Sequence, residues 1–489
     1  MKHFPWLLTL LITLSACAHP AAAPTAGAPS PSIRYQLAFR PDAHEIIVGM
    51  EYVAQGSDAD VTFTLPVWAP GYYLIVDYPK NLYDFAACQT DGMPLRWEKV
   101  GKNHWRVEKP CNDTLRVQYR VFADERSVAE CRVEHDVAFV PGNGVFMYPE
   151  GGKALPVEVG FTLPEHWHTV ATALDSCEGR WIAPDFDVLY DSPFLLGNPA
   201  VRTFEQEGHR YTFAIEAPEG FDASPLAADW LKGVHEATQL FGDVPYDRYV
   251  LLLLGAGRGG LEHQSCQADY TTDNWQFADR ASYISMLTFL THEYFHNYNV
   301  KAIRPIELGP FDYNQENYTP MLWVSEGFTC YYESKLLARA GVLTDEERLK
   351  ELAVYIRDLE STEGRHHMSL RQSSYDIWLN FFNFAANHSD VTLSYYVKGP
   401  VVGLLFDCWY EAHGTSLDAL MRLLYDRYYR DLQRGFTEQE FWEAAEEIAA
   451  GTEQALRPYV DTTLDIPYAT FLAPVGLQYD GATGQLSRL

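Results

Sequence analysis

Two histidines separated by three residues, with a glutamate after the first, constrain this chain more than any other feature. The stretch from His292 to His296 reads His-Glu-Tyr-Phe-His, and the apolar run at 284–290 before it has a helix-like composition. On a helix, residues four positions apart share one face, so both imidazoles can bind one metal ion. Glu293 can then accept a proton from a water molecule on that metal. The alternative is two surface histidines on an amphipathic helix, but the motif seldom arises by chance.

A catalytic zinc site needs a third protein ligand, because such sites combine three protein ligands with one open position. Segment 322–337 has apolar residues at helical spacing and contains Glu326. A carboxylate from a downstream helix is the usual third ligand, so we predict that Glu326 completes the site. Glu333 and Glu316 are the competing candidates. The other interpretation of Glu326 is a solvated carboxylate on a helix surface.

The length and the charge of the chain limit its architecture and its partners. With 489 residues, the chain is too long for one compact core and predicts two or more domains. Apolar residues make up 47% of the sequence, which indicates ordered globular structure over most of it. The net charge of −29 argues against nucleic acid as a partner, because phosphates require Lys and Arg. It also argues against an electrostatic attraction to anionic lipids.

Residues 1–16 have the features of a bacterial lipoprotein signal peptide. An apolar core precedes Leu14-Ser-Ala-Cys17, which resembles a lipobox, where the signal is cut before a cysteine that is then lipidated. A plain secretory signal is the alternative. Residues 17–32 are rich in Ala, Pro, Thr and Ser and predict a flexible tether. We therefore expect an exported lipoprotein of the bacterial cell envelope, and Ala18 after the lipidated Cys17 favours the outer membrane over the inner membrane.

The rest of the chain predicts a multidomain protein of the α+β class. Residues 33–204 contain short alternating segments, such as 114–121, separated by turn sequences. They predict an all-β, sandwich-like N-terminal domain that walls or positions the second domain. Helical patterns dominate residues 205–470, where we expect a mainly α-helical catalytic domain, and residues 471–489 are expected to form a C-terminal tail.

A glycine-rich stretch, Gly255-Ala-Gly-Arg-Gly-Gly260, follows a predicted strand and satisfies the G-x-G-x-x-G pattern of dinucleotide sites. Such a site needs a helix that opens at the glycines and repeated βαβ units. The following residues 261–270 have no helical period. We therefore predict a glycine-rich turn that leads into an extended strand at the edge of a cleft.

Several motifs, in this order, resemble those of the glycyl aminopeptidase family. They are Gly259-Gly-Leu-Glu-His263, the stretch from His292 to Lys301, Ser325-Glu-Gly-Phe-Thr329 and Ser394-Tyr-Tyr-Val-Lys-Gly399. Members of this family are gluzincin metallopeptidases with a thermolysin-like catalytic domain, distantly related to aminopeptidase N. The resemblance covers nearly all of the chain after the tether, so it implies a thermolysin-like fold for residues 205–470.

The resemblance implies roles for the metal centre. One zinc ion would be held by His292, His296 and Glu326. Glu293 would act as the general base on the zinc-bound water and pass the proton to the leaving amine. Tyr396 would donate a hydrogen bond to the developing oxyanion, whereas the neighbouring Tyr395 is the less favoured choice for that role.

The resemblance also implies how a substrate is bound. Glu262 aligns with the glutamate that binds a free α-amino group, and Gly259 and Gly260 lie beside it in the same substrate-binding segment. His263 departs from the asparagine found in aminopeptidase N, which weakens the assignment of Glu262. Its alternative role is a carboxylate at the edge of a cleft with another partner.

Other departures lie outside the ligand set. Tyr298 and Ala302 stand where family members often have tryptophan and arginine. Members commonly carry a PDZ domain after the catalytic helices, and from the residues up to Leu489 we expect none here. We expect a zinc aminopeptidase that acts on peptides with free N-termini and small first residues, Gly or Ala. The alternatives are a zinc endopeptidase of the same fold and a catalytically inactive, membrane-tethered binding protein.

Overall fold

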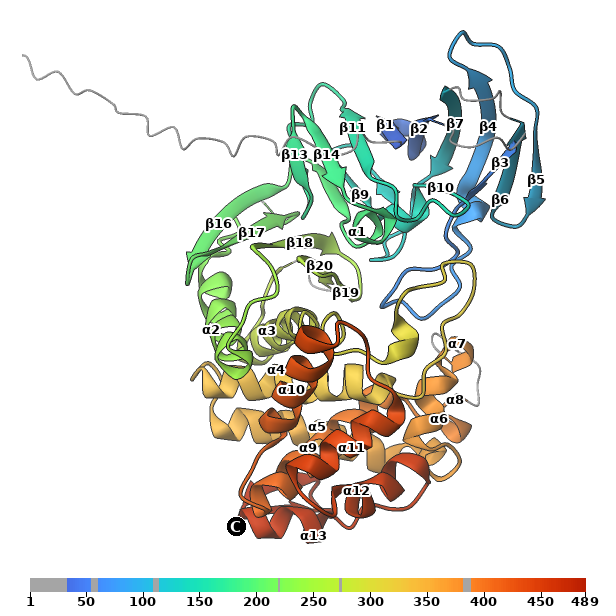
Figure 1. Ribbon diagram of the computed structural model, residues 1–489. Coiled ribbons are helices and arrows are strands. Elements are labelled where there is room, and N and C mark those ends of the chain that lie inside the picture. The colour runs from blue at the N-terminus through green and yellow to red at the C-terminus, as the bar shows by residue number, and fades with distance from the viewer. Residues whose placement is uncertain (1–32, 54–59, 109–113, 219, 272–274, 381–387) are drawn as a thin grey trace, which may run out of the picture.

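The chain folds into a β-rich first part and a largely helical second part, which lie one above the other in Figure 1. This computed structural model describes residues 33–489, apart from 54–59, 109–113, 219, 272–274 and 381–387. The predicted signal peptide, the lipidation site Cys17 and the tether therefore lie outside the described residues. The predicted α+β class, with an all-β part followed by a mainly helical part, is confirmed.

The first sheet of the β-rich part has the strand order β13-β14-β11-β1-β2-β7-β4. Its strands are β1 (Ile33–Arg40), β2 (Glu45–Val53), β4 (Leu82–Gln89), β7 (Thr114–Phe122), β11 (Val157–Thr162), β13 (Asp175–Cys177) and β14 (Arg180–Ala183). Every second side chain of β7, from Leu115 to Val121, is buried, because successive side chains of a strand point to opposite faces. These inward-facing side chains belong to the apolar core of the first part.

A second sheet has the order β10-β3-β6-β5, and a third has the order β12-β15-β9-β8. Their strands are β3 (Asp60–Thr64), β5 (Trp97–Gly101), β6 (His104–Glu108), β8 (Arg132–Val133), β9 (Val137–Val140), β10 (Tyr148–Pro149), β12 (Thr169–Ala171) and β15 (Phe194–Gly197). The short helix α1 (Phe186–Tyr190) is capped by the Asp185 carboxylate, which accepts a hydrogen bond from the Val188 amide. Asp191 follows α1 directly, and the chain then enters β15.

The second part begins with a sheet of order β16-β17-β18-β20-β19. Its strands are β16 (Ala200–Gln206), β17 (His209–Ile215), β18 (Arg248–Ala256), β19 (Gly260–Glu262) and β20 (Cys266–Thr271). This sheet starts with β16, a few residues before position 205, where the sequence predicts the start of the catalytic domain. The glycine-rich segment ends β18 at Ala256 and begins β19 at Gly260, so the glycines lead into an extended strand, as the sequence predicts, and this strand is an edge of the sheet.

Helices α2 and α3 lie next to this sheet, and most of the later helices are stacked below them in Figure 1. The helices are α2 (Ser224–Phe241), α3 (Arg280–Phe295), α4 (Phe328–Arg339), α5 (Asp345–Ser361), α6 (Leu370–Tyr375), α7 (Ile377–Asn380), α8 (His388–Val391), α9 (Tyr395–Ala412), α10 (Leu417–Leu424), α11 (Glu438–Ile448), α12 (Thr452–Asp461) and α13 (Tyr468–Leu472). A final hairpin, β21 (Leu477–Asp480) and β22 (Gln485–Arg488), packs against α5. Among the described residues, no helix is both long and apolar enough to cross a membrane.

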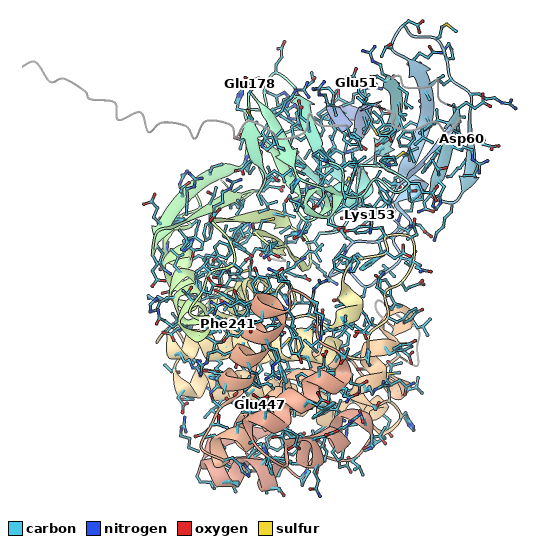
Figure 2. All side chains as sticks on the ribbon, viewed as in Figure 1. Glu51, Asp60, Lys153, Glu178, Phe241 and Glu447 are labelled. Carbon is cyan, nitrogen blue, oxygen red and sulfur yellow. The ribbon has the colours of Figure 1, made fainter. Side chains whose placement is uncertain are left out.

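The two parts share an apolar cluster where they meet. Leu252 of β18 packs in this cluster with Phe139 of β9 and Leu195 of β15. Lys153, labelled at the junction in Figure 2, donates a hydrogen bond from Nζ to the Phe311 carbonyl oxygen at 2.6 Å. The cluster holds the sheet of the second part, including its edge strand β19, against the β-rich part.

Candidate active site

Helix α3 carries both histidines of the motif into the interior. The helix begins with a capping box, in which the Asp279 carboxylate accepts a hydrogen bond from the Ser282 amide and the Ser282 hydroxyl accepts one from the Asp279 amide. His292 lies in the last turn, and His296 follows directly after the helix. Their exposed fractions are 8% and 1%. The histidines thus lie on and just after a helix, as the motif predicts, and they are not surface residues.

The side chains of His292, His296 and Glu326 converge on one point. The Nε2 atoms of the two histidines lie 3.0 Å apart. Oε2 of Glu326 lies 3.6 Å from Nε2 of His292 and 3.3 Å from Nε2 of His296. All three side chains are buried and form a group that could hold a metal ion. The structure therefore brings together the ligand set that the sequence predicts.

Each imidazole is held from its other side by a hydrogen-bond acceptor. Nδ1 of His296 donates to the Asn299 carbonyl oxygen at 2.7 Å, and Nδ1 of His292 donates to Oε2 of Glu333 at 3.0 Å. Each Nε2 therefore keeps its lone pair, and both lone pairs face the Glu326 carboxylate. Lone pairs this close repel one another unless a cation lies between them. Two imidazoles and a carboxylate with supporting acceptors behind the rings fit a catalytic zinc ion.

Of the competing carboxylates, Glu333 lies on the opposite side of the His292 ring from Glu326, where it forms a separate group with His292 and Cys330 that could hold a metal ion. Glu333 holds Nδ1 of His292, and its other oxygen accepts a hydrogen bond from the Tyr355 hydroxyl at 2.9 Å. The Cys330 sulfur also lies 3.6 Å from Nδ1 of His292. Glu316 belongs to none of the ligand groups in the described part of the chain. Glu333 is therefore a positioning residue for His292, a role that the sequence analysis missed.

Glu326 lies in a π-helical turn, Trp323–Gly327, directly before α4. Such turns are rare and occur frequently at functional sites. Asn299 ties this turn to the end of α3, because its Nδ2 donates to the carbonyl oxygens of Val324 at 2.8 Å and Ser325 at 3.0 Å. The second histidine and the carboxylate ligand are thereby held in one hydrogen-bonded unit.

Helix α9 packs closely against the π-helical turn that carries Glu326, because two glycines face each other there, Gly327 on the turn and Gly399 on α9. A Cβ atom on Gly327 would lie 2.5 Å from the Cα atom of Gly399, so a side chain at position 327 would force the two elements apart. At the start of α9, Tyr395 is fully buried and Tyr396 is partly exposed. Burial, together with the charge of Glu326, raises the pKa of the Tyr396 hydroxyl well above its ordinary value. Tyr396 therefore remains a hydrogen-bond donor at neutral pH, and a substrate can reach it more easily than Tyr395.

The predicted base, Glu293, lies against the edge strand. It is 5% exposed, and burial raises its pKa to about 8, although the nearby histidines oppose this shift. A cation bound beside it would lower this pKa again. A Cβ atom on Gly260 would lie 2.2 Å from Oε1 of Glu293, so only glycine allows the base to approach β19. Gly259 has a φ of +91°, which favours glycine at the turn before the strand.

Glu262, at the end of β19, is a buried carboxylate, 4% exposed. One of its oxygens lies within 4.8 Å of ligand atoms of Glu293 and His296, and these three residues are another group at this site that could hold a metal ion. Glu262 lines a cavity of about 620 Å³ together with His263, Tyr73 and Lys301. Gly71 of the first part lies against the Glu262 carboxylate. The site is therefore built from both parts of the chain and presents an unpaired negative charge beside the metal ligands.

Two sequence models of one peptidase family match this chain. The Peptidase M61 N-terminal domain matches residues 34–198, and the M61 glycyl aminopeptidase domain matches residues 285–402. The chain belongs to the M61 glycyl aminopeptidase family. This M61 protein is accordingly a metallopeptidase. A search of curated protein sequences found no match.

Solved structures with similar folds include other peptidases. An aminopeptidase N family protein from Idiomarina loihiensis is 25% identical, with a TM-score of 0.86 over 91% of this chain and 78% of that protein. The M1 zinc metallopeptidase from Deinococcus radiodurans is 16% identical, with a TM-score of 0.55 over 89% of this chain and 94% of that protein. Leukotriene A4 hydrolase from Saccharomyces cerevisiae is 12% identical, with a TM-score of 0.52 over 89% of this chain and 68% of that protein. The two structures that are 16% and 12% identical to this chain show a similarity of fold alone.

The M61 chain also contains an ion network between its two parts that the sequence analysis missed. Nζ of Lys301 lies 2.8 Å from Oδ1 of Asp191, and Nδ1 of His263 lies 3.1 Å from the same oxygen. Burial alone raises the pKa of Asp191, but Lys301 and His263 outweigh it and hold the pKa at about 2. His263, which replaces the asparagine of aminopeptidase N, thus pairs with Asp191 directly after Glu262.

Proposed function

We propose that this M61 protein is a zinc aminopeptidase that removes small N-terminal residues, Gly or Ala, from peptides. The carrying observation is Glu262, a carboxylate that is 4% exposed, lines the cavity and forms no ion pair with a Lys or Arg of the described residues. A buried, unpaired charge is costly, so such a group is expected to have a ligand of opposite charge. The α-ammonium group of a peptide supplies both the positive charge and the hydrogen-bond donors.

The catalytic roles follow from the arrangement around β19. His292, His296 and Glu326 would hold one zinc ion, which when bound supplies a Lewis acid that lowers the pKa of a water molecule and polarises a carbonyl group. Glu293 lies against Gly260 and acts as the general base: its carboxylate accepts a proton from the attacking water and passes it to the leaving amine. Binding of the free N-terminus at Glu262 would align the first peptide bond with this base.

Tyr396 has the role of the oxyanion donor in this proposal. Its hydroxyl stays protonated because burial raises its pKa well above the ordinary value. A neutral hydroxyl can donate a hydrogen bond to the carbonyl oxygen as negative charge develops on it. The close approach of Gly327 and Gly399 sets the position of α9, which carries this tyrosine, relative to the turn that carries Glu326.

The preference for Gly and Ala rests on the family resemblance and is supported by the packing around Glu262. A Cβ atom on Gly71 would lie 2.6 Å and 2.7 Å from the two carboxylate oxygens, and 2.7 Å from Cδ1 of Leu261. The carboxylate that would bind the amine is thus closely covered on one side. A bulky first residue would have to avoid this cover.

We also propose that the enzyme acts in the bacterial cell envelope, anchored through a lipid on Cys17. The support is the lipobox-like sequence that ends at Cys17 and the tether-like composition of residues 17–32. Metabolic labelling with palmitate should mark the wild-type protein and not Cys17→Ser. Equal labelling of both proteins would rule out Cys17 as the lipidation site.

Hydrolysis of peptides led by Gly or Ala, with free and with N-acetylated termini, tests the proposed activity. We expect cleavage of the free forms only, loss of cleavage after chelation and recovery on addition of zinc. Glu262→Gln keeps the size of the side chain and removes its charge, so it should lose the preference for the free amine. Cleavage of the acetylated forms by the wild type would instead indicate an endopeptidase. Absence of cleavage with zinc bound would favour a binding role.

A further inference from the structure

We propose a second metal site in the β-rich part, formed by His135, Asp136 and His166, which takes a divalent late first-row ion such as Zn²⁺. Each of these residues offers one ligand atom, and these atoms all lie within 4.8 Å of one another. The group shares no residue with the catalytic ligands on α3 and the π-helical turn. This inference goes beyond the proposed peptidase activity and does not depend on it.

The two loops that carry these ligands are joined by hydrogen bonds that their backbone carbonyl oxygens accept. The His135 carbonyl oxygen accepts from Nε1 of Trp167 at 2.8 Å and from Nε2 of His166 at 2.7 Å. Asn198 bridges the same loops, because its amide donates to the Asp136 carbonyl oxygen at 3.0 Å and its Nδ2 donates to the His166 carbonyl oxygen at 2.9 Å. The backbone positions of all three ligands are therefore set before an ion binds.

Gly197, at the end of β15, makes this close approach of the loops possible. Its φ is +116°, and a Cβ atom there would lie 2.2 Å from the Asp136 carbonyl oxygen. A side chain at this position would push Asp136 away from the neighbouring loop. The two loops are thus tightly packed against each other at Gly197, and the ligand side chains extend from this packed region.

The side chains themselves face solvent and one another. The imidazole rings of His135 and His166 lie 4.7 Å apart, centroid to centroid, with 31° between their planes. Oδ1 of Asp136 lies 2.9 Å from Nδ1 of His135. Because Nε2 of His166 donates to a carbonyl oxygen, Nδ1 of that ring keeps a lone pair. Small rotations of exposed side chains bring these donors to one ion, and solvent supplies water for the open coordination positions.

The donor set selects the class of ion. Imidazole nitrogens suit Zn²⁺, Ni²⁺ and Cu²⁺, whereas Mg²⁺ and Ca²⁺ prefer sites built from oxygen ligands. The net charge of −29 raises the concentration of cations near the protein. The geometry therefore favours a late first-row ion that exchanges with solvent, and Zn²⁺ is the probe used below.

Equilibrium dialysis of the full chain against rising free Zn²⁺, followed by elemental analysis, counts the ions per chain. We expect the wild type to bind two ions and His135→Gln/His166→Gln to bind one. Glutamine preserves a hydrogen-bonding side chain, and the backbone carbonyls of the two loops are unchanged. The matched control is His366→Gln/His367→Gln, which removes a histidine pair that belongs to no ligand group among the described residues and should still bind two ions.

Two further measurements make the test decisive. Asp136→Asn keeps both imidazoles and should weaken the second ion's binding while the first ion stays bound. A millimolar excess of Mg²⁺ should not displace the second ion. A histidine double variant that binds as many ions as the wild type, or displacement of the second ion by Mg²⁺, would each overturn the proposal, whether or not the catalytic group holds an ion.

Discussion

Gly71 of the β-rich part lies directly against the Glu262 carboxylate of the second part, where a Cβ atom would be only 2.6 Å from Oε1. The φ of Gly71 is +87°, so its backbone conformation also favours glycine. The group proposed to bind the substrate amine is thus positioned by a residue from the other part of the chain. This explains in physical terms why the β-rich part belongs to the active site.

Gly71→Ala should raise KM for peptides with free N-termini about tenfold, which corresponds to about 1.4 kcal/mol of lost binding free energy. The added methyl group displaces Glu262, while Glu293 and the metal ligands stay in place, so kcat should change less. Steady-state kinetics with a Gly-led peptide measures both constants.

Gly92→Ala is the matched control for this substitution. Gly92 lies in the same part of the chain with a φ of +89°, but nothing lies within 4 Å of its Cβ position. Both variants carry a similar backbone strain of about 1–2 kcal/mol. Identical KM values for the two variants would mean that strain, and not contact with Glu262, explains any effect.

Glu293→Gln should lower kcat by about a thousandfold, within the range of about 10²–10⁴ typical for loss of a general base. Zinc content should remain at the wild-type level, because the proposed ligands His292, His296 and Glu326 are unchanged. Elemental analysis and peptide hydrolysis on the same sample measure both properties. Turnover within tenfold of the wild type would remove Glu293 from the base role.

The local part of the site was predictable from the sequence, because the i, i+4 geometry that pairs His292 with His296 depends only on the helix. The choice between Glu326 and Glu333 was less certain. Both are carboxylates of one downstream helical segment, and only the tertiary structure shows which imidazole nitrogen each one faces. The π-helical turn that carries Glu326 has no local signature, because it depends on Asn299 reaching its carbonyl oxygens.

Contacts between residues far apart in the sequence were also not predictable, because they too depend on the tertiary structure. Nothing in the sequence indicates that Gly71 and Glu262, far apart along the chain, lie against each other. Lys301 ends a motif that the family resemblance uses, but the motif does not indicate that Lys301 pairs with Asp191 of the β-rich part. The fold class and the order of the two parts were predictable, because they follow from the spacing of apolar residues and from turn sequences, which are local properties.

Tyr355→Phe and Glu333→Gln should weaken zinc binding, since acceptors behind a metal-bound histidine fix its tautomer and orientation. We expect a loss of about 10–100-fold in zinc affinity for Glu333→Gln and a smaller loss for Tyr355→Phe. Competition with a chelator measures the affinity. At saturating zinc, kcat should recover, because these residues position His292 and do not contact the substrate.

Tyr375→Phe is the control for the tyrosine variant, because Tyr375 is 46% exposed and lies outside the metal centre. It should leave zinc affinity unchanged. If Tyr355→Phe also leaves the affinity unchanged, the hydrogen bond from Tyr355 to Glu333 does not contribute to metal binding.

Asp191→Asn should destabilise the fold at neutral pH by about 2–3 kcal/mol, because the half-buried Lys301 ammonium loses its counter-charge. The pKa of Asp191 is about 2 in the folded state, against about 3.9 for an unperturbed carboxyl. A carboxyl with a lowered pKa stabilises the fold above its unfolded pKa and loses this contribution as pH falls through its folded pKa. The difference between wild type and variant should therefore be constant from pH 7 to about pH 5 and shrink from about pH 4 towards pH 2. Urea unfolding over this pH range measures the difference.

Asp345→Asn, which breaks a solvent-exposed pair with Arg488, is the control and should cost at most about 1 kcal/mol. Equal losses for the two variants would show that the Asp191–Lys301 pair has no special role in joining the two parts.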